Sequence, residues 1–132
     1  MIKKVPIIDP VSGKRIGYKS KKFYFEFTLY MEPEFKQWNR VAKDRFLDHF
    51  QRYHASDAYQ GNIDFHVNAN YWSGTRVFGE GDFLIPSSYM EDKWTKTELK
   101  EVAEDAISNV IAYDLSRMEQ DMIKKYTVKI KG

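Results

Sequence analysis

Residues 62–72 read NIDFHVNANYW and alternate strictly between polar and apolar side chains up to Tyr71. An alternation with a period of two is typical of a β-strand that buries one face and exposes the other. The core face is predicted to hold Ile63, Phe65, Val67, Ala69 and Tyr71. The opposite face is predicted to hold Asn62, Asp64, His66, Asn68 and Asn70. The stretch therefore predicts a strand over Asn62–Trp72 in a partly exposed sheet.

The polar side of this strand is the best functional signal in the chain. Asn and Asp are poor strand formers, so several of them on one face carry a local cost that a binding role would compensate. His66 and Asp64 have the chemistry of a base and its orienting carboxylate. The alternative is an ordinary solvated sheet face, where polar residues belong.

A second strand is predicted to follow through a tight turn. Ser73-Gly74 suits a two-residue hairpin turn leading into Thr75–Phe78. In that register Ala69 meets Phe78 on the core side. Residues 82–94 are predicted to form a loop.

The same register sets two glycines beside the polar row. Gly79 and Gly81 would face Asn68 and His66 and leave a shallow open trough. However, Glu80 would then lie opposite core-facing Val67. A β-bulge near Gly79 would relieve that conflict.

The N-terminal part of the chain predicts three further strands. Val5–Ile8 and Lys14–Tyr18 flank a turn sequence and form a hairpin, with Pro6 at a sheet edge. Phe23–Tyr30 alternates cleanly. Its polar side is predicted to carry Tyr24, Glu26, Thr28 and Tyr30.

Two helices are predicted from apolar positions spaced by three and four residues. Pro33 opens the first helix, which fades near His54–Ala55. Its stripe consists of Phe35, Trp38, Ala42, Phe46, Phe50 and Tyr53. The second helix begins at a Thr95/Glu98 capping box and runs to about Lys124. Its two stripes are Leu99, Ala103, Ala106, Val110 and Tyr113, and Ile107, Ile111, Leu115, Met118 and Met122.

A final short strand is predicted over Tyr126–Ile130. The expected fold is a single α+β domain over residues 1–132. Its sheet is antiparallel or mixed, in the order β-β-α-β-β-α-β, with two amphipathic helices packed on one face. The other face then carries the polar row and the Tyr24 side of Phe23–Tyr30.

Composition and motifs exclude several kinds of site. The chain has no cysteine, so disulfides and thiolate chemistry are absent. The start MIKKVP lacks the apolar run of a signal peptide, and no stretch is long enough for a membrane span, so a cytoplasmic location is expected. Nucleotide-binding and nucleophile-elbow motifs are missing, and no cofactor is expected. The spacing of His49, His54 and His66 predicts no metal site; His49 is expected to pack beside the apolar stripe.

Two charged surfaces remain as candidates. The net charge is only +2, but the first 56 residues are basic and residues 57–121 are acidic. A basic patch flanked by tyrosines would suit a phosphate backbone. It consists of Lys14, Arg15, Lys19, Lys21 and Lys22. An acidic stripe on the second helix, Glu98, Glu101 and Asp105, would suit a basic groove on a partner, although it also complements the helix dipole.

The sequence therefore favours a non-catalytic binding module for a macromolecular partner, most of all a protein. A small cysteine-free chain of this style fits an accessory protein or inhibitor from a phage or mobile element. The predicted contact surfaces are the acidic stripe and the polar sheet face. The alternatives are nucleic-acid binding through the basic patch and a metal-dependent hydrolase built on Asp64, Glu80 and Asp82. A long helix and an edge strand would also permit a homodimer.

Overall fold

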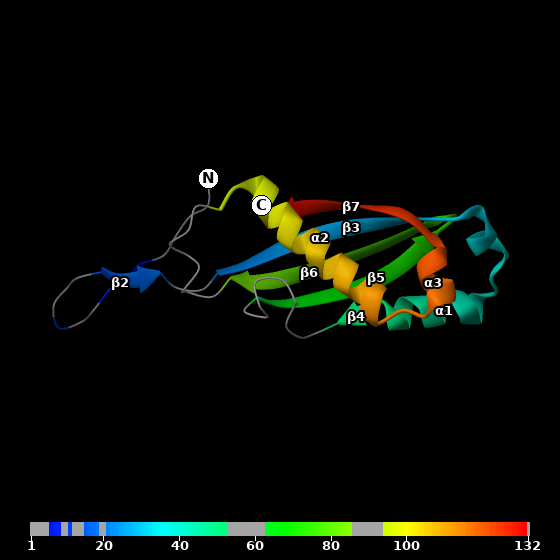
Figure 1. The fold of residues 1–132 in the computed structure, drawn as a ribbon, viewed down its shortest axis with the longest axis horizontal. Helices are drawn as coiled ribbons and strands as arrows, with labels where there is room; N and C mark the ends of the chain where they lie inside the picture. The colour runs from blue at the N-terminus through cyan, green and yellow to red at the C-terminus, as the bar shows by residue number, and fades with distance from the viewer. Residues whose placement is uncertain are drawn as a thin grey trace.

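An antiparallel five-stranded sheet forms the centre of the fold (Figure 1). The computed structural model describes residues 6–8, 11, 15–18, 21–52, 63–85 and 94–131. The strand order is β4-β5-β6-β3-β7, and every neighbouring pair is antiparallel. The strands are β3 (Lys21–Met31), β4 (Gln51–Arg52), β5 (Asp64–Ser73), β6 (Arg76–Ile85) and β7 (Ile123–Lys131).

The helical segments pack on one side of this sheet. They are η1 (Pro33–Gln37), α1 (Arg40–His49), α2 (Lys96–Tyr113) and α3 (Arg117–Asp121). In Figure 1, α2 lies diagonally across the sheet, while α1 and α3 lie together at one end. Phe46 of α1 and Val102 of α2 belong to the same hydrophobic cluster as the sheet residues. The α+β class predicted from the sequence is therefore confirmed.

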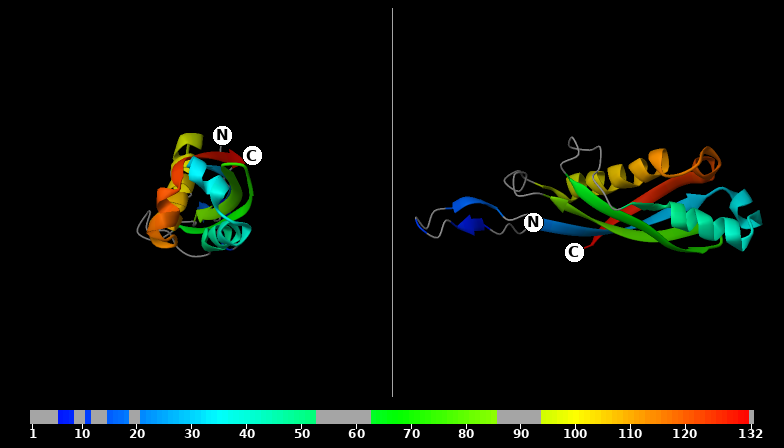
Figure 2. Two further views of the ribbon diagram at one scale, coloured as in Figure 1. Left: turned by 90° about the vertical axis from the view of Figure 1, so that its right-hand side faces the viewer. Right: turned by 90° about the horizontal axis from the view of Figure 1, so that it is seen from below.

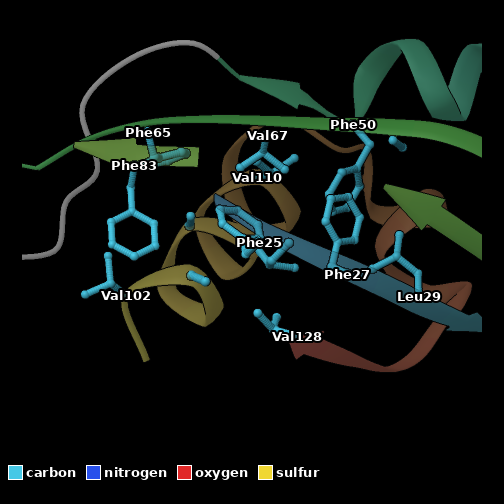
Figure 3. Packing of buried hydrophobic residues seen from close by; sticks show 14 of the residues in the cluster. Phe25, Phe27, Leu29, Phe50, Phe65, Val67, Phe83, Val102, Val110 and Val128 are labelled. Atoms are coloured by element: carbon cyan, nitrogen blue, oxygen red, sulfur yellow. The ribbon is translucent and has the colours of Figure 1, made fainter. Parts of the chain in front are cut away.

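The core is built on a row of aromatic side chains from β3. Phe25, Phe27 and Leu29 are almost completely buried and point toward the helical side (Figure 3). Phe27 contacts Phe50 with ring centroids 5.3 Å apart. Burial of each such side chain contributes roughly 1.5–3 kcal/mol. Because alternate side chains of a strand point to opposite faces, the remaining side chains of β3 lie on the face opposite the helices.

The element order differs in detail from the predicted one. A hairpin of β1 (Pro6–Ile8) and β2 (Arg15–Tyr18) forms a separate two-stranded antiparallel sheet, as the turn sequence predicted. It lies beyond one end of the larger sheet (Figures 1 and 2). Three strands precede the first helical segment, which agrees with the three strands predicted there one by one but not with the predicted order, which counted two. The short β4 adds another strand after α1.

The single helix predicted from Pro33 to about Ala55 is wrong. The chain forms η1, becomes extended at Trp38 (φ −66°, ψ 139°) and restarts as α1. Asn39 caps the new helix, because its side-chain oxygen accepts a hydrogen bond of 2.8 Å from the Ala42 N–H. Asn is a favoured N-cap residue, so this local signal outweighs the apolar periodicity. The predicted end at 54–55 lies outside the described residues, but α1 already ends at His49.

The long second helix is also wrong beyond Tyr113. Thr95 caps its start as predicted, accepting from the Glu98 N–H at 3.1 Å. Ser116 then begins α3 with a full capping box, in which Glu119 accepts from the Ser116 N–H at 3.0 Å. A capping box marks a helix start, so the apolar pattern spans two helices instead of one. Lys124 and Lys125 belong to β7, which is longer than the predicted Tyr126–Ile130.

The predicted hairpin exists with a different turn. Ser73 pairs with Arg76, so Gly74 and Thr75 form the turn, with Gly74 at φ 62°. β5 covers Asp64–Ser73, while Asn62 lies outside the described residues. The following strand runs to Ile85 instead of giving way to a loop at residue 82.

A bulge at residue 70 changes the predicted faces. Ala69 pairs with Gly79, whereas Tyr71 pairs with Phe78, which leaves Asn70 as the extra residue of β5. A bulge reverses the alternation, so Tyr71 lies on the exposed face and not in the core. Phe78 is likewise on that face, and the predicted contact of Ala69 with Phe78 in the core is wrong.

The two glycines of β6 face the core instead of the polar row. Gly81 pairs with Val67, and both glycines are buried. A Cβ atom on Gly79 would overlap the Phe27 ring, and one on Gly81 would overlap the Phe25 ring. The glycines thus make room for β3 aromatics, and the predicted register that set them opposite Asn68 and His66 is wrong.

None of the helices formed by the described residues is both long and apolar enough to span a membrane.

Candidate functional site

The sheet face opposite the helices, here called the outer face, carries a regular grid of polar and aromatic side chains. The residues predicted to share it do so: Tyr24, Glu26, Tyr30, Asp64, His66, Asn68 and Asn70. Strand register orders them into rows. One row is His66, Asp82, Tyr24 and Lys131; the next is Asn68, Glu80, Glu26 and Lys129. The carboxylates thus lie on the inner strands, and the lysines lie along β7.

Two carboxylates and one lysine form the centre of the outer face. Glu26 and Glu80 are direct cross-strand partners. Lys131 Nζ reaches diagonally to both, at 3.3 Å from Glu26 Oε1 and 3.4 Å from Glu80 Oε2. The hydrogen bond to Glu26 is the main cause that raises the pKa of Lys131. Like charges directly across a sheet repel, so the chain's own lysine compensates this pair.

His66 contacts a different carboxylate from the predicted one. Its Nδ1 lies 3.5 Å from Asp82 Oδ2 on β6, whereas Asp64 lies one row further along β5. A shallow hollow here is lined by Tyr24, His66, Glu80, Gly81, Asp82 and Lys131. The sequence analysis named Asp82 only for the hydrolase alternative and missed its contact with His66, because it assigned residue 82 to a loop. The signal was available in the alternation of Val77, Gly79, Gly81, Phe83 and Ile85, if glycine is allowed as a core residue.

An aromatic pair, the exposed Tyr71 and the half-buried Phe78, adjoins these carboxylates. The Tyr71 and Phe78 rings stack with centroids 5.0 Å apart and planes at 23°. Tyr71 is 56% exposed, which is high for so large a ring. A second hollow is lined by Glu26, Phe27, Thr28, Asn70, Tyr71, Phe78, Gly79 and Glu80. Glu80 borders both hollows, so the acidic surface and the aromatic surface adjoin at this residue.

Tyr30 lies between two cations at the far end of the outer face. The Arg76 guanidinium lies 5.3 Å and Lys125 Nζ 5.1 Å from the centre of its ring. Both distances suit cation–π attraction, which holds the ring in place. The outer face is therefore acidic in its middle and basic toward this end and along β7.

The acidic stripe of the second helix is only partly available for a partner. Glu98 is half-buried, and its carboxylate accepts a hydrogen bond of 3.2 Å from the Thr95 hydroxyl. Glu101 and Asp105 are exposed, and partial burial raises the pKa of Asp105. The hydrogen bond with the N-cap residue Thr95 explains the presence of Glu98 without any role in binding a partner protein.

The basic patch stays a prediction. Lys14 and Lys19 lie outside the described residues, and Arg15 is described only as part of β2. Lys21 Nζ lies 5.2 Å from the centre of the Phe23 ring. Lys22 is exposed on the outer face, in the same row as Leu84 and Asp64. Of Lys21 and Lys22, the two patch residues whose side chains the structure describes, Lys22 lies on the candidate site.

Asp64, Glu80 and Asp82, the carboxylates of the hydrolase alternative, lie on successive rows of β5 and β6. Within the described ranges, no group of three or more His, Asp or Glu side chains is arranged to hold a metal ion.

A scan against protein-family models, a search of curated proteins and a search of solved structures each found no significant match to this chain.

Proposed function

We propose that this protein is a non-catalytic binding module that engages a protein partner through the outer face of its sheet. The observation that carries the proposal is the pairing of Glu26 with Glu80 beside the stack of exposed Tyr71 on half-buried Phe78. Facing carboxylates destabilise a sheet unless a cation joins them. Their placement beside a partly exposed aromatic pair is better explained by recognition than by folding.

The chemistry of the two hollows defines the partner segment. The carboxylates favour a lysine or arginine side chain, and the aromatic pair favours an apolar neighbour. Tyrosine and other aromatic side chains are enriched at protein interfaces, where they supply large contact area. The partner segment is therefore basic and apolar in alternation, and Lys131 takes the place of its cation in the free protein.

The outer face is preferred over the acidic stripe for this role. The stripe offers isolated carboxylates on one helix, one of them engaged by Thr95. The outer face instead combines charge, aromatic surface and shape. A cytoplasmic accessory protein or inhibitor is the corresponding biological role, supported by the cysteine-free sequence.

Binding to short peptides tests the chemistry. Fluorescence anisotropy would be measured with the full chain and labelled peptides that place Lys or Arg beside Leu or Phe. We expect binding that weakens about tenfold when peptide lysines become Glu, and that weakens in Glu80→Gln. The matched control is Glu101→Gln on α2, which should bind like the wild type. Equal affinity for the acidic peptides, or an equal loss in the control, would contradict the proposal.

A further inference from the structure

The strand β7 is the main open edge of the five-stranded sheet. It covers Ile123–Lys131 and, within the described ranges, pairs only with β3, whereas the other edge strand is the two-residue β4. Its register with β3 is regular from Lys125 to Lys131. Figure 1 shows β7 along one border of the sheet. An unpaired strand edge of this length presents a row of backbone N–H and C=O groups to any further strand.

The charge on this edge is of one sign. All charged residues of β7 are lysines and all are exposed: Lys124, Lys125, Lys129 and Lys131. Edge lysines protect a sheet from indiscriminate pairing. A second copy is a poor occupant, because antiparallel pairing centred on Thr127 would set Lys125 opposite Lys129 of that copy. The same lysines favour a strand of opposite charge.

We infer that β7 accepts an extended acidic segment of another protein as an additional strand. Lys125, Thr127 and Lys129 share the outer face, so acidic side chains at alternate positions of the added strand lie beside the two lysines. Tyr126 and Ile130 point to the helical side and are half-buried, and Tyr126 Oη contacts Ser108 Oγ on α2 at 2.6 Å. Apolar side chains at the remaining positions of the added strand lie on the helical side and extend the apolar surface there.

The added strand gains affinity from main-chain hydrogen bonds and specificity from these alternating contacts, as in β-augmentation generally. Lys131 is held by Glu26 and Glu80, so Lys125 and Lys129 carry most of the charge recognition. The edge of β7 adjoins the first hollow at Lys131, but no residue of β7 lines the hollow beside Tyr71 and Phe78. The inference therefore goes beyond the proposed function and does not depend on it.

The test uses the full chain and a synthetic peptide as long as β7, with Glu alternating with Thr and Val. Anisotropy should show binding that weakens with salt, and hydrogen exchange should show new protection confined to β7. Lys125→Glu/Lys129→Glu should bind the acidic peptide at least about tenfold more weakly and bind a lysine version of the peptide more tightly than the wild type does. Circular dichroism would confirm that the variant is folded.

Matched controls separate strand addition from simple charge attraction. Lys96→Glu/Lys100→Glu makes the same change of charge at exposed positions of α2 and should bind the acidic peptide like the wild type. A peptide of the same charge with a central proline should not protect β7, because proline cannot continue the ladder. Absence of binding, equal loss in both double variants, or equal binding of the proline peptide would overturn the inference. Concentration-dependent protection of β7 without peptide would assign the edge to a second copy and would also overturn it.

Discussion

Glu26 on β3 and Glu80 on β6 are direct neighbours across the sheet, and the two carboxylates share Lys131 Nζ at 3.3 and 3.4 Å. The repulsion between these two carboxylates in the middle of the outer face is therefore balanced by a lysine from the edge strand β7. Because all three side chains are about half exposed, a cation of a partner can reach the two carboxylates and replace Lys131 there. This relationship links the stability of the sheet to the proposed recognition.

Replacing Lys131 tests the balance directly. Lys131→Met leaves the carboxylates facing each other, so its thermal unfolding midpoint should be lower than the wild-type midpoint at pH 7 and low salt. The pKa of Lys131 is raised in the folded protein, so its stabilising contribution is complete below its ordinary pKa of 10.5. That contribution is lost as the pH rises through the raised folded value. The two midpoints should therefore converge at high pH.

They should also converge in high salt, which screens exposed charges. The neighbouring exposed lysine provides the control, since Lys129→Met should change the midpoint less. A midpoint difference between wild type and Lys131→Met that persists unchanged at high pH and high salt would show that Lys131 acts through packing and not through charge.

The same substitution should improve binding of a basic peptide. In the free protein Lys131 occupies the position between the carboxylates that the partner's cation is proposed to take. Removing the lysine removes this competition, so Lys131→Met should bind the lysine-bearing peptide several-fold more tightly. Anisotropy titrations of wild type and variant measure this. Weaker binding by the variant would mean that Lys131 itself belongs to the recognition surface.

Gly79 should tolerate no side chain. A Cβ there would overlap the Phe27 ring and approach the Asn68 carbonyl oxygen at 2.5 Å. Overpacking of this kind costs about 1–3 kcal/mol, so Gly79→Ala should lower the free energy of unfolding measured in urea by that amount. Gly74→Asn is the matched control, because Gly74 at φ 62° has open space around it and Asn accepts this conformation. Equal losses in the two variants would argue against the close contact with Phe27.

A buried carboxylate joins two of the helices and should matter for stability. Glu119 is only 5% exposed, and its Oε2 lies 2.9 Å from His49 Nδ1. Glu119→Ala removes this contact and the capping bond to Ser116, and should cost about 1–3 kcal/mol of unfolding free energy. Glu119→Gln should cost less, since Gln also completes a capping box. If Gln is as damaging as Ala in urea unfolding, the charge and not the cap is the main contribution.

The features that the sequence predicted correctly are those that follow from a regular alternation of apolar and polar residues. The alternation of β3 and of the first part of β5 correctly separated core from surface, and the polar residues named from it share the outer face. The prediction that His49 packs beside the apolar stripe missed its contact with Glu119. That contact joins residues far apart in sequence, and no local pattern encodes it.

Local signals that interrupt a period account for the remaining errors. Asn39 and Ser116 start new helices inside patterns that looked continuous, because N-cap hydrogen bonds outweigh apolar spacing. The bulge at Asn70 reversed the faces of Tyr71 and Phe78. The sequence predicts a bulge near Gly79 but not its position at Asn70, because the packing of Gly79 against the Phe27 ring depends on β3 and cannot be seen within the hairpin alone. The aromatic pair of the candidate site follows from that bulge.

Affinity capture with the full chain tests whether the outer face binds a protein. The wild type, Tyr71→Ser/Phe78→Ser and the control Tyr113→Ser would each be immobilised and exposed to nuclease-treated lysate of the native host. Tyr113 is 67% exposed at the end of α2, away from the outer face. If the outer face binds a protein, one protein is retained by the wild type and by Tyr113→Ser and is lost from the double variant. Retention of the same protein by the folded double variant, or of none by the wild type, would contradict it.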